Sequence, residues 1–280
     1  MKAQSRYVTV LDREIHYMEW GAPDAPPLIM WHGLARTGRD FDDLADALCD
    51  RWRVLVPDTI GRGLSQWSPA PETEYCNDFY ARLATGFLDA LGLHKVDWVG
   101  TSMGGAIAIR AGAGPLQGRI GKLVLNDMGP KISDASIERI RSYAGHPPRF
   151  DRVSELEAYL RTIYKPYGWI SDAQWRRMAE TSTRRLPDGG VTTHYDPKMV
   201  MQFTEHAEDY AQWPQFLALD CDILCLRGET SDLLLEADAA EMVARHPRCT
   251  LVTVAGCGHA PALNVAEQFG LVANFLGAGA

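Results

Sequence analysis

Residues 96–111 read Val96-Asp-Trp-Val-Gly100-Thr-Ser102-Met-Gly104-Gly105-Ala-Ile-Ala-Ile-Arg-Ala, a β-branched apolar run, a glycine-flanked serine and a helical run in direct succession. A Gly-x-Ser-x-Gly turn between a strand and a helix is typical of a nucleophile elbow, whose tightness demands small neighbours such as Gly100 and Gly104. Ser102 would then lie at a helix N-terminus, where free N–H groups favour negative charge. We therefore predict Ser102 as a nucleophile.

A second glycine turn, Trp31-His32-Gly33-Leu34, follows another expected strand. Around an elbow, the loop after that strand supplies one backbone N–H to an oxyanion hole, and the residue after the nucleophile supplies the other. The predicted donors are therefore Leu34 and Met103. His32 is interpreted as a loop-bracing residue, because most buried imidazoles satisfy backbone groups.

A base for the serine is predicted at His259, in Ala255-Gly-Cys-Gly-His259-Ala-Pro after the last expected strand. A serine hydroxyl is a weak nucleophile and needs a base within about 2.6–3.2 Å to take its proton. The chain order nucleophile, acid, histidine also favours this residue.

The acid that orients this histidine is predicted at Asp232, a few residues past the seventh expected strand. A carboxylate there would accept the Nδ1–H of His259 and stabilise the imidazolium. Two alternatives stay open, because Glu229 lies in the same loop and Asp127 follows the sixth expected strand.

The stretch Asp58-Thr-Ile-Gly-Arg62-Gly-Leu-Ser65 is interpreted as a structural loop at the same sheet edge. Polar loop groups usually bond to backbone, so Asp58 and Arg62 are expected to hold the loop rather than to react.

Short β-branched runs alternate with helical runs, which predicts an α/β fold with a mostly parallel sheet covered by helices. Eight strands are expected, at residues 6–11, 14–20, 28–31, 54–57, 96–100, 122–126, 223–227 and 250–254. Core helices are expected at residues 41–48, 77–91, 103–113, 237–245 and 266–276.

The regular alternation stops at residues 129–213, a block of about 85 residues that is too long for a loop. We predict a helical cap there, inserted into a core made of residues 1–128 and 214–280. The block is rich in aromatic side chains, which suit either a substrate pocket or the cap's own core.

Composition excludes several classes of protein. A net charge of −8 without any Lys/Arg run argues against nucleic-acid partners. The N-terminal segment does not resemble a signal peptide, and no apolar run reaches the ~18 residues of a membrane span, so no membrane partner and a cytoplasmic location are expected. The six cysteines are scattered without a Cys-x-x-Cys pair, and we interpret them as reduced packing residues.

These motifs together resemble the α/β-hydrolase superfamily, in its branch of capped bacterial carboxylesterases, lactonases and carbon–carbon bond hydrolases. The resemblance covers the core, residues 28–105 and 223–261, and rests on five motifs: His32-Gly33, Asp58 to Ser65, Ser102 to Gly105, Asp232, and Gly256 to Pro261. It implies a Ser-His-Asp triad that works through an acyl-enzyme and needs no metal or cofactor.

Within that superfamily, haloalkane dehalogenases and epoxide hydrolases use an aspartate nucleophile, so Ser102 argues against both. The carbon–carbon hydrolases carry asparagine where this chain has Thr101. We therefore expect a carboxylesterase acting on a small or medium, largely apolar small-molecule ester or lactone. The alternatives are a lactonase, a carbon–carbon bond hydrolase of a vinylogous diketone, and a ligand-sensing receptor on the same fold.

Overall fold

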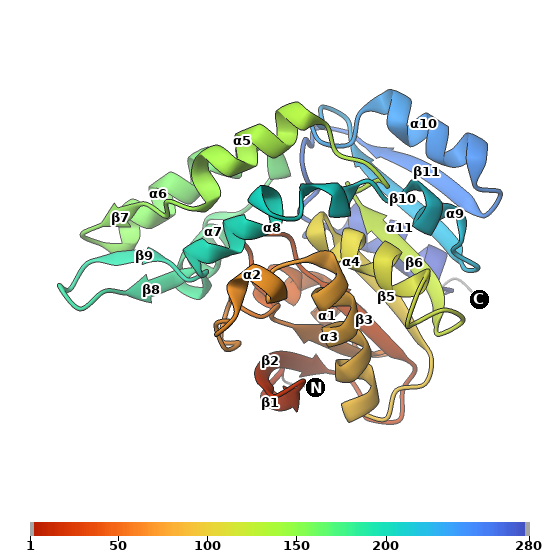
Figure 1. Ribbon diagram of the computed structural model, residues 1–280, viewed down its shortest axis with the longest axis horizontal. Helices are drawn as coiled ribbons and strands as arrows, with labels where there is room; N and C mark the ends of the chain where they lie inside the picture. Colours follow the sequence, from red (N-terminus) through yellow and green to blue (C-terminus); the bar gives the residue numbers. More distant parts are fainter. Residues whose placement is uncertain (1–2, 278–280) are drawn as a thin grey trace.

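The computed structural model describes residues 3–277 of the 280-residue chain, and its centre is one eight-stranded sheet (Figure 1). The strands lie in the order β1-β2-β4-β3-β5-β6-β10-β11. The β1–β2 and β2–β4 pairs are antiparallel and the other pairs are parallel. The strands are β1 (Gln4–Val10), β2 (Arg13–Trp20), β3 (Pro27–Trp31), β4 (Arg53–Pro57), β5 (Val96–Thr101), β6 (Ile120–Asn126), β10 (Asp222–Gly228) and β11 (Cys249–Val254). The predicted fold class and all eight strands are confirmed.

Helices cover both faces of the sheet (Figure 1). One face packs against α3 (Asn77–Ala90), α4 (Met103–Gly112) and α10 (Glu236–Arg245). The opposite face packs against α1 (Asp42–Leu48) and α11 (Ala266–Leu276). The connecting loops contain two short elements, η1 (Gly38–Phe41) and α2 (Pro71–Glu74). Among the described helices, none combines the length and the apolar character needed to cross a membrane.

Two stacked tryptophans join the strands that lead to the sequence motifs. Trp31 on β3 and Trp98 on β5 are fully buried, with ring centroids 5.2 Å apart and ring planes at 2°. Because β3 and β5 are parallel neighbours, the turns that follow them emerge side by side at the carboxyl edge of the sheet.

The segment between β6 and β10, residues 129–213, is called the insert below. It extends away from the sheet at the left of Figure 1, in green and teal. Its elements are α5 (Asp134–Ala144), β7 (Arg149–Phe150), α6 (Val153–Ile163), η2 (Lys165–Tyr167), α7 (Asp172–Thr181), β8 (Thr183–Arg185), β9 (Val191–Thr193), η3 (Pro197–Val200), α8 (Met201–Thr204), η4 (Ala207–Tyr210) and the start of α9 (Trp213–Leu217). The small sheet β7-β9-β8 was not expected in a helical segment. Strands of two or three residues are too short for alternation to reveal.

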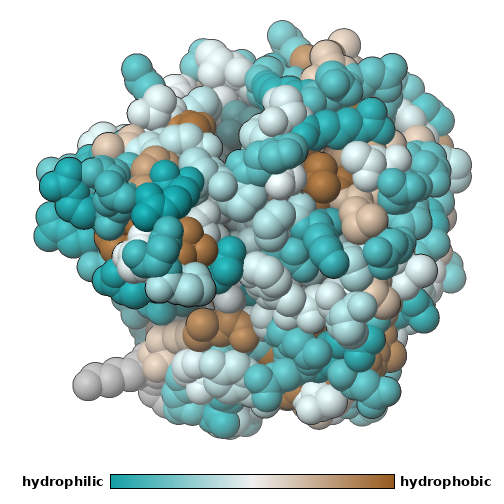
Figure 2. Space-filling view, turned by 60° about the vertical axis from the view of Figure 1, so that its left-hand side comes forward, coloured by the Kyte–Doolittle hydropathy of each residue, from teal (hydrophilic) through white to brown (hydrophobic). Residues whose placement is uncertain are grey.

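The insert has a small core of its own. Leu156, Leu160, Ala179 and Val191 are buried together where α6, α7 and β9 meet. On the face shown in Figure 2, hydrophilic residues predominate and hydrophobic ones occur in small separate groups. Much of the insert's apolar surface is therefore used in packing.

Two helical glycines provide a matched test of the close packing at the start of α4. A Cβ at Gly104 would lie 2.0 Å from the backbone oxygen of Trp31, whereas one at Gly270 in α11 would meet nothing within 4 Å. We expect Gly104→Ala to lower the free energy of unfolding by about 1–3 kcal/mol or more. Gly270→Ala should raise it by about 0.5–1 kcal/mol. Urea unfolding measures both, and equal shifts would contradict this packing.

Candidate active site

The turn between β5 and α4 holds Ser102 in an unusual backbone conformation. Ser102 is the N-cap of α4, with φ 50° and ψ −117°, a region that non-glycine residues rarely adopt. A Cβ at Gly100 would lie 2.5 Å from the backbone of Gly104, so the two sides of the turn touch. This is the predicted elbow, and it leaves the Ser102 side chain half-buried at the sheet edge.

A continuous chain of hydrogen bonds leads away from the serine. Ser102 Oγ lies 3.0 Å from Nε2 of His259, and Nδ1 of His259 lies 2.6 Å from Oδ2 of Asp127. A carboxylate can only accept, so Nδ1 carries the proton and Nε2 accepts from the serine hydroxyl. The His259 side chain is 20% exposed, while that of Asp127 is fully buried.

The carboxylate of Asp127 is held from several sides. Besides His259, it accepts from the backbone N–H of Gly228 at 2.8 Å and from the hydroxyl of Ser231 at 2.5 Å. Three donors converge on this buried carboxylate and fix it in place.

The prediction that Asp232 orients His259 is wrong. Its side chain is 59% exposed and forms an ion pair with Arg139 of the insert. The other alternative, Glu229, accepts from the backbone N–H of Gly256 at 3.0 Å. Asp127, just after β6, is fixed toward His259 by its bonds to Gly228 and Ser231, whereas Asp232 turns away to Arg139.

The loop after β3 lies beside the serine. A Cβ at Gly33 would come 3.6 Å from the Cβ of Ser102, and Arg62 Nε donates to the Leu34 carbonyl at 3.0 Å. Met103 is the first residue of α4, a position at which the N–H has no partner within the helix. Met103 and the 33–34 turn thus lie beside Ser102, and the roles of Leu34 and Met103 as oxyanion donors stay predictions.

His32 braces this loop, as predicted. Its Nδ1–H donates to the carbonyl of Gly33 at 2.7 Å, and its Nε2 accepts from the backbone N–H of Thr59 at 2.9 Å. Burial disfavours the charged imidazolium and lowers the pKa of His32 to about 4. The residue is therefore neutral and structural near pH 7.

The loop from Asp58 to Ser65 is also structural, as predicted. Buried Asp58 accepts from the backbone N–H groups of Gly38 at 2.8 Å and Leu64 at 3.0 Å, and from Nδ1 of His16 at 2.7 Å. Burial alone would raise the pKa of Asp58, but the hydrogen bonds from His16 and from the backbone N–H of Leu64 help to lower it. Arg62, besides its bond to Leu34, donates to the carbonyl of Ile60 at 2.9 Å.

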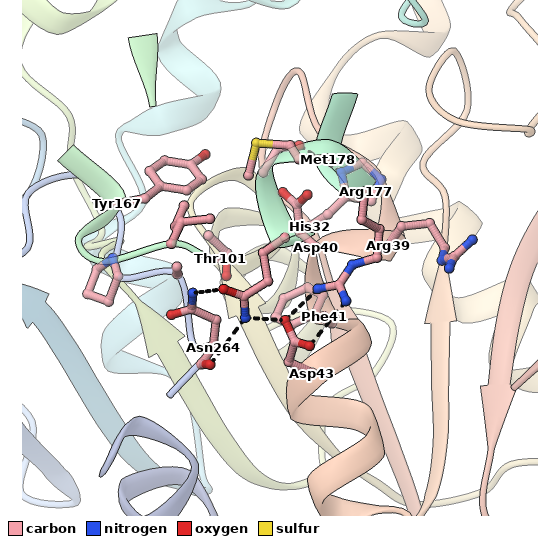
Figure 3. Close-up of a pocket in the computed structure, with 15 residues that line it drawn as sticks. His32, Arg39, Asp40, Phe41, Asp43, Thr101, Tyr167, Arg177, Met178 and Asn264 are labelled. Atoms are coloured by element: carbon pink, nitrogen blue, oxygen red, sulfur yellow. Dashed lines mark hydrogen bonds and ion pairs between the residues drawn. The ribbon is translucent and has the colours of Figure 1, made fainter. Parts of the chain in front are cut away.

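A pocket lies between the insert and the core beside the elbow (Figure 3). Its lining includes a polar network in which Asp43 accepts from Gln174 Nε2 at 2.9 Å and pairs with Arg177, while Asn264 donates to Gln174 at 3.2 Å. The lining is His32, Gly33, Arg39, Asp40, Phe41, Asp43, Thr101, Tyr167, Ile170, Gln174, Arg177, Met178, Pro261, Ala262 and Asn264. The pocket therefore combines apolar side chains with a charged and polar network.

Within residues 3–277, no three or more His, Cys, Asp or Glu side chains are grouped so that they could hold a metal ion. The six cysteines are free and buried, as expected for packing residues.

Comparison with known proteins agrees with this architecture. A model of the alpha/beta hydrolase family matches residues 28–269. The 3-hydroxybutyrate-oligomer hydrolase of Cupriavidus necator is 40% identical, covering 92% of this chain and 91% of its own length. The 2-(acetamidomethylene)succinate hydrolase of Mesorhizobium japonicum is 25% identical, covering 84% and 81%. A crystal structure of an α/β hydrolase from Novosphingobium aromaticivorans superimposes with a TM-score of 0.86 and 34% identity, covering 98% of both chains.

The class of protein defined by the fold and these relatives is a hydrolase. The chain belongs to the α/β-hydrolase family, as the sequence motifs implied.

The neutral state of His32 predicts a pH dependence of stability. Between pH 6.5 and about 4 the unfolded chain binds a proton at this residue and the folded chain does not, so stability falls as pH drops through that window. We expect His32→Gln to make the dependence of unfolding free energy on pH shallower there, by up to about 1.4 kcal/mol per pH unit. Urea unfolding at several pH values measures the slope.

The control is His146→Gln, which changes an exposed histidine of the insert and should leave the slope unchanged. An unaltered slope in His32→Gln would show that the buried imidazole does not contribute.

Proposed function

We propose that this hydrolase cleaves a carboxylic ester by acyl transfer, with Ser102 as nucleophile, His259 as base and Asp127 as the orienting acid. The observation that carries the proposal is the unbroken chain from Ser102 Oγ through both nitrogens of His259 to the buried Asp127 carboxylate. Nucleophile, base and orienter within hydrogen-bond reach are the signature of an activated serine.

The first half-reaction forms an acyl-enzyme. His259 Nε2 takes the Ser102 proton while Oγ attacks the ester carbonyl carbon, and the carbonyl oxygen becomes an oxyanion bound by the N–H groups of Leu34 and Met103. The imidazolium, stabilised by Asp127, then gives its proton to the departing alcohol as the ester C–O bond breaks.

The second half-reaction returns the enzyme to its starting state. His259 removes a proton from water, and the resulting hydroxide attacks the acyl carbon through a second oxyanion. The Ser102 ester bond breaks, Oγ recovers the proton from His259, and a carboxylic acid leaves.

The substrate that the site favours is a short ester of a hydroxy acid. The relative from Cupriavidus necator acts on 3-hydroxybutyrate oligomers, and such units are short chains that carry oxygen atoms along their length. The pocket, which is lined by Gly33 and Thr101 beside the elbow, offers a matching environment, because it combines apolar side chains such as Ile170 and Met178 with the polar network around Asp43 and Gln174. In this proposal the insert serves as the cap over the substrate, which is less apolar than the sequence led us to expect.

The proposal that the bond is an ester predicts which substrates react fastest and that their hydrolysis requires Ser102. We expect kcat/KM for a 3-hydroxybutyrate dimer to exceed that for p-nitrophenyl butyrate, a lactone and a vinylogous diketone. In Ser102→Ala every such rate should fall by about 10⁴–10⁶-fold, because the nucleophile is lost. A folded Ser102→Ala protein that keeps its activity would contradict the proposed function. A preference for the diketone would change the bond class to carbon–carbon, and a preference for the lactone would make the substrate a cyclic ester instead of an open chain.

The acid is tested by a pair of identical substitutions. Asp127→Asn should lower kcat by about 10⁴-fold, because the amide favours the wrong tautomer of His259. Asp232→Asn should leave kcat within about twofold, because an exposed ion pair contributes little. Steady-state hydrolysis of p-nitrophenyl butyrate measures kcat of both variants. A larger loss of kcat in Asp232→Asn than in Asp127→Asn would make Asp232 the orienting acid.

A further inference from the structure

The N–H of Leu34, the proposed oxyanion donor, shares a peptide unit with the carbonyl of Gly33. That carbonyl accepts from the backbone N–H of Arg36 at 3.2 Å and from the Nδ1–H of His32 at 2.7 Å. The next carbonyl along the chain, that of Leu34, accepts from Arg62 Nε at 3.0 Å. The direction of the Leu34 N–H therefore depends on how this turn, including Arg36, is fixed.

Arg36 is fixed by contacts to both the core and the insert. Arg36 is only 2% exposed. Its Nε and Nη2 donate to the two carboxylate oxygens of Asp40 at 2.7 and 2.6 Å. Nη1 donates to the hydroxyl of Ser182 in the insert at 3.0 Å. The guanidinium also lies 4.8 Å from the ring centre of Tyr164, another residue of the insert.

A second connection runs from the same place in the insert to the other core loop. The His194 N–H donates to the Ser182 carbonyl at 2.9 Å, and Nδ1 of His194 accepts from the Gly63 N–H at 2.7 Å. Gly63 directly follows Arg62, which binds Leu34. Ser182 and His194 thus complete a ring of interactions around the Leu34 peptide.

We propose that Arg36 and Ser182 are positioning residues for the oxyanion hole, so that the seating of the insert on the core sets the direction of the Leu34 N–H. The inference rests on the proposed function. Two other links between insert and core end elsewhere: Tyr75 donates to Asp196 at 2.7 Å, and Arg177 pairs with Asp43. The Arg36–Ser182 hydrogen bond, like the contact of Arg36 with Tyr164, ends on the turn that carries the donor.

A change in the direction of the Leu34 N–H affects the energy of the transition state and not that of the bound substrate. A misdirected Leu34 N–H costs little when substrate binds, but it weakens the bond to the oxyanion that develops during attack. Loss of positioning therefore lowers kcat and leaves KM nearly unchanged.

The test is Ser182→Ala, which removes the insert's acceptor and leaves the Arg36–Asp40 pair intact. We expect kcat for p-nitrophenyl butyrate to fall about tenfold, because a hydrogen bond to a charged group is lost, while KM stays within about twofold. A trifluoromethyl ketone, which adds Ser102 to form a tetrahedral oxyanion, should bind about tenfold more weakly. A purely structural role for Ser182 would lower the melting temperature without moving either value.

The matched control is Thr183→Ala. The Thr183 hydroxyl donates to the Ala179 carbonyl at 2.7 Å, a bond that stays within the insert. This variant should keep kcat and inhibitor affinity within about twofold. The inference is overturned if Ser182→Ala keeps both values, or if Thr183→Ala loses as much.

Arg36→Lys provides a second measurement, because lysine keeps the charge and loses the planar fork. We expect kcat to fall further in Arg36→Lys than in Ser182→Ala. The double variant, with both substitutions, should be no slower than Arg36→Lys alone, because both substitutions break the same Arg36–Ser182 connection. Effects that simply multiply would contradict the coupling. These outcomes are distinct from failure of the proposed function, in which Ser102→Ala itself would stay active.

Discussion

The approach of α4 to the strands beneath it is the constraint on which the site depends. A Cβ at Gly104 would lie 2.0 Å from the Trp31 oxygen, and one at Gly100 would lie 2.5 Å from the backbone of Gly104. The helix can begin this close to the sheet only because both positions lack side chains. The chain between them is forced into a sharp turn, and Ser102 takes up the positive φ. Since Trp31 leads directly into the 32–34 loop, the same contact brings the loop to the serine.

Buried hydrogen bonds then fix the loops at this edge. His32 bonds to Gly33 and Thr59, and Asp58 bonds to Gly38, Leu64 and His16. Leaving any of these buried groups without a partner would cost about 1–3 kcal/mol, so each one selects a single loop conformation. Donors held in this way need no reorganisation when charge develops on a substrate, which is the condition for effective electrostatic stabilisation.

The nucleophile and the base could be predicted from motifs and chain order, and the acid could not. The elbow at Ser102 is a short motif whose residues touch one another, and His259 was predicted from its glycine-flanked loop and its place late in the chain. Asp127 and Asp232 both follow strands that end at the same edge of the sheet. Only the fold shows that Asp232 turns outward to Arg139 while Asp127 bonds to His259. Ser182 and His194 belong to no motif, and their partners Arg36 and Gly63 are more than a hundred residues away.

The aromatic side chains of the insert show how little composition alone says about a pocket. Phe203 and Tyr210 stack at 5.0 Å with ring planes at 10° and are buried in the hydrophobic core. Tyr167 is the single aromatic residue of the described insert among those that line the pocket beside the elbow. The pocket lining also contains polar side chains, among them Asp43, which pairs with Arg177. The aromatic content therefore reflects mainly how the insert packs, and the residues that line the pocket are the better basis for a substrate proposal.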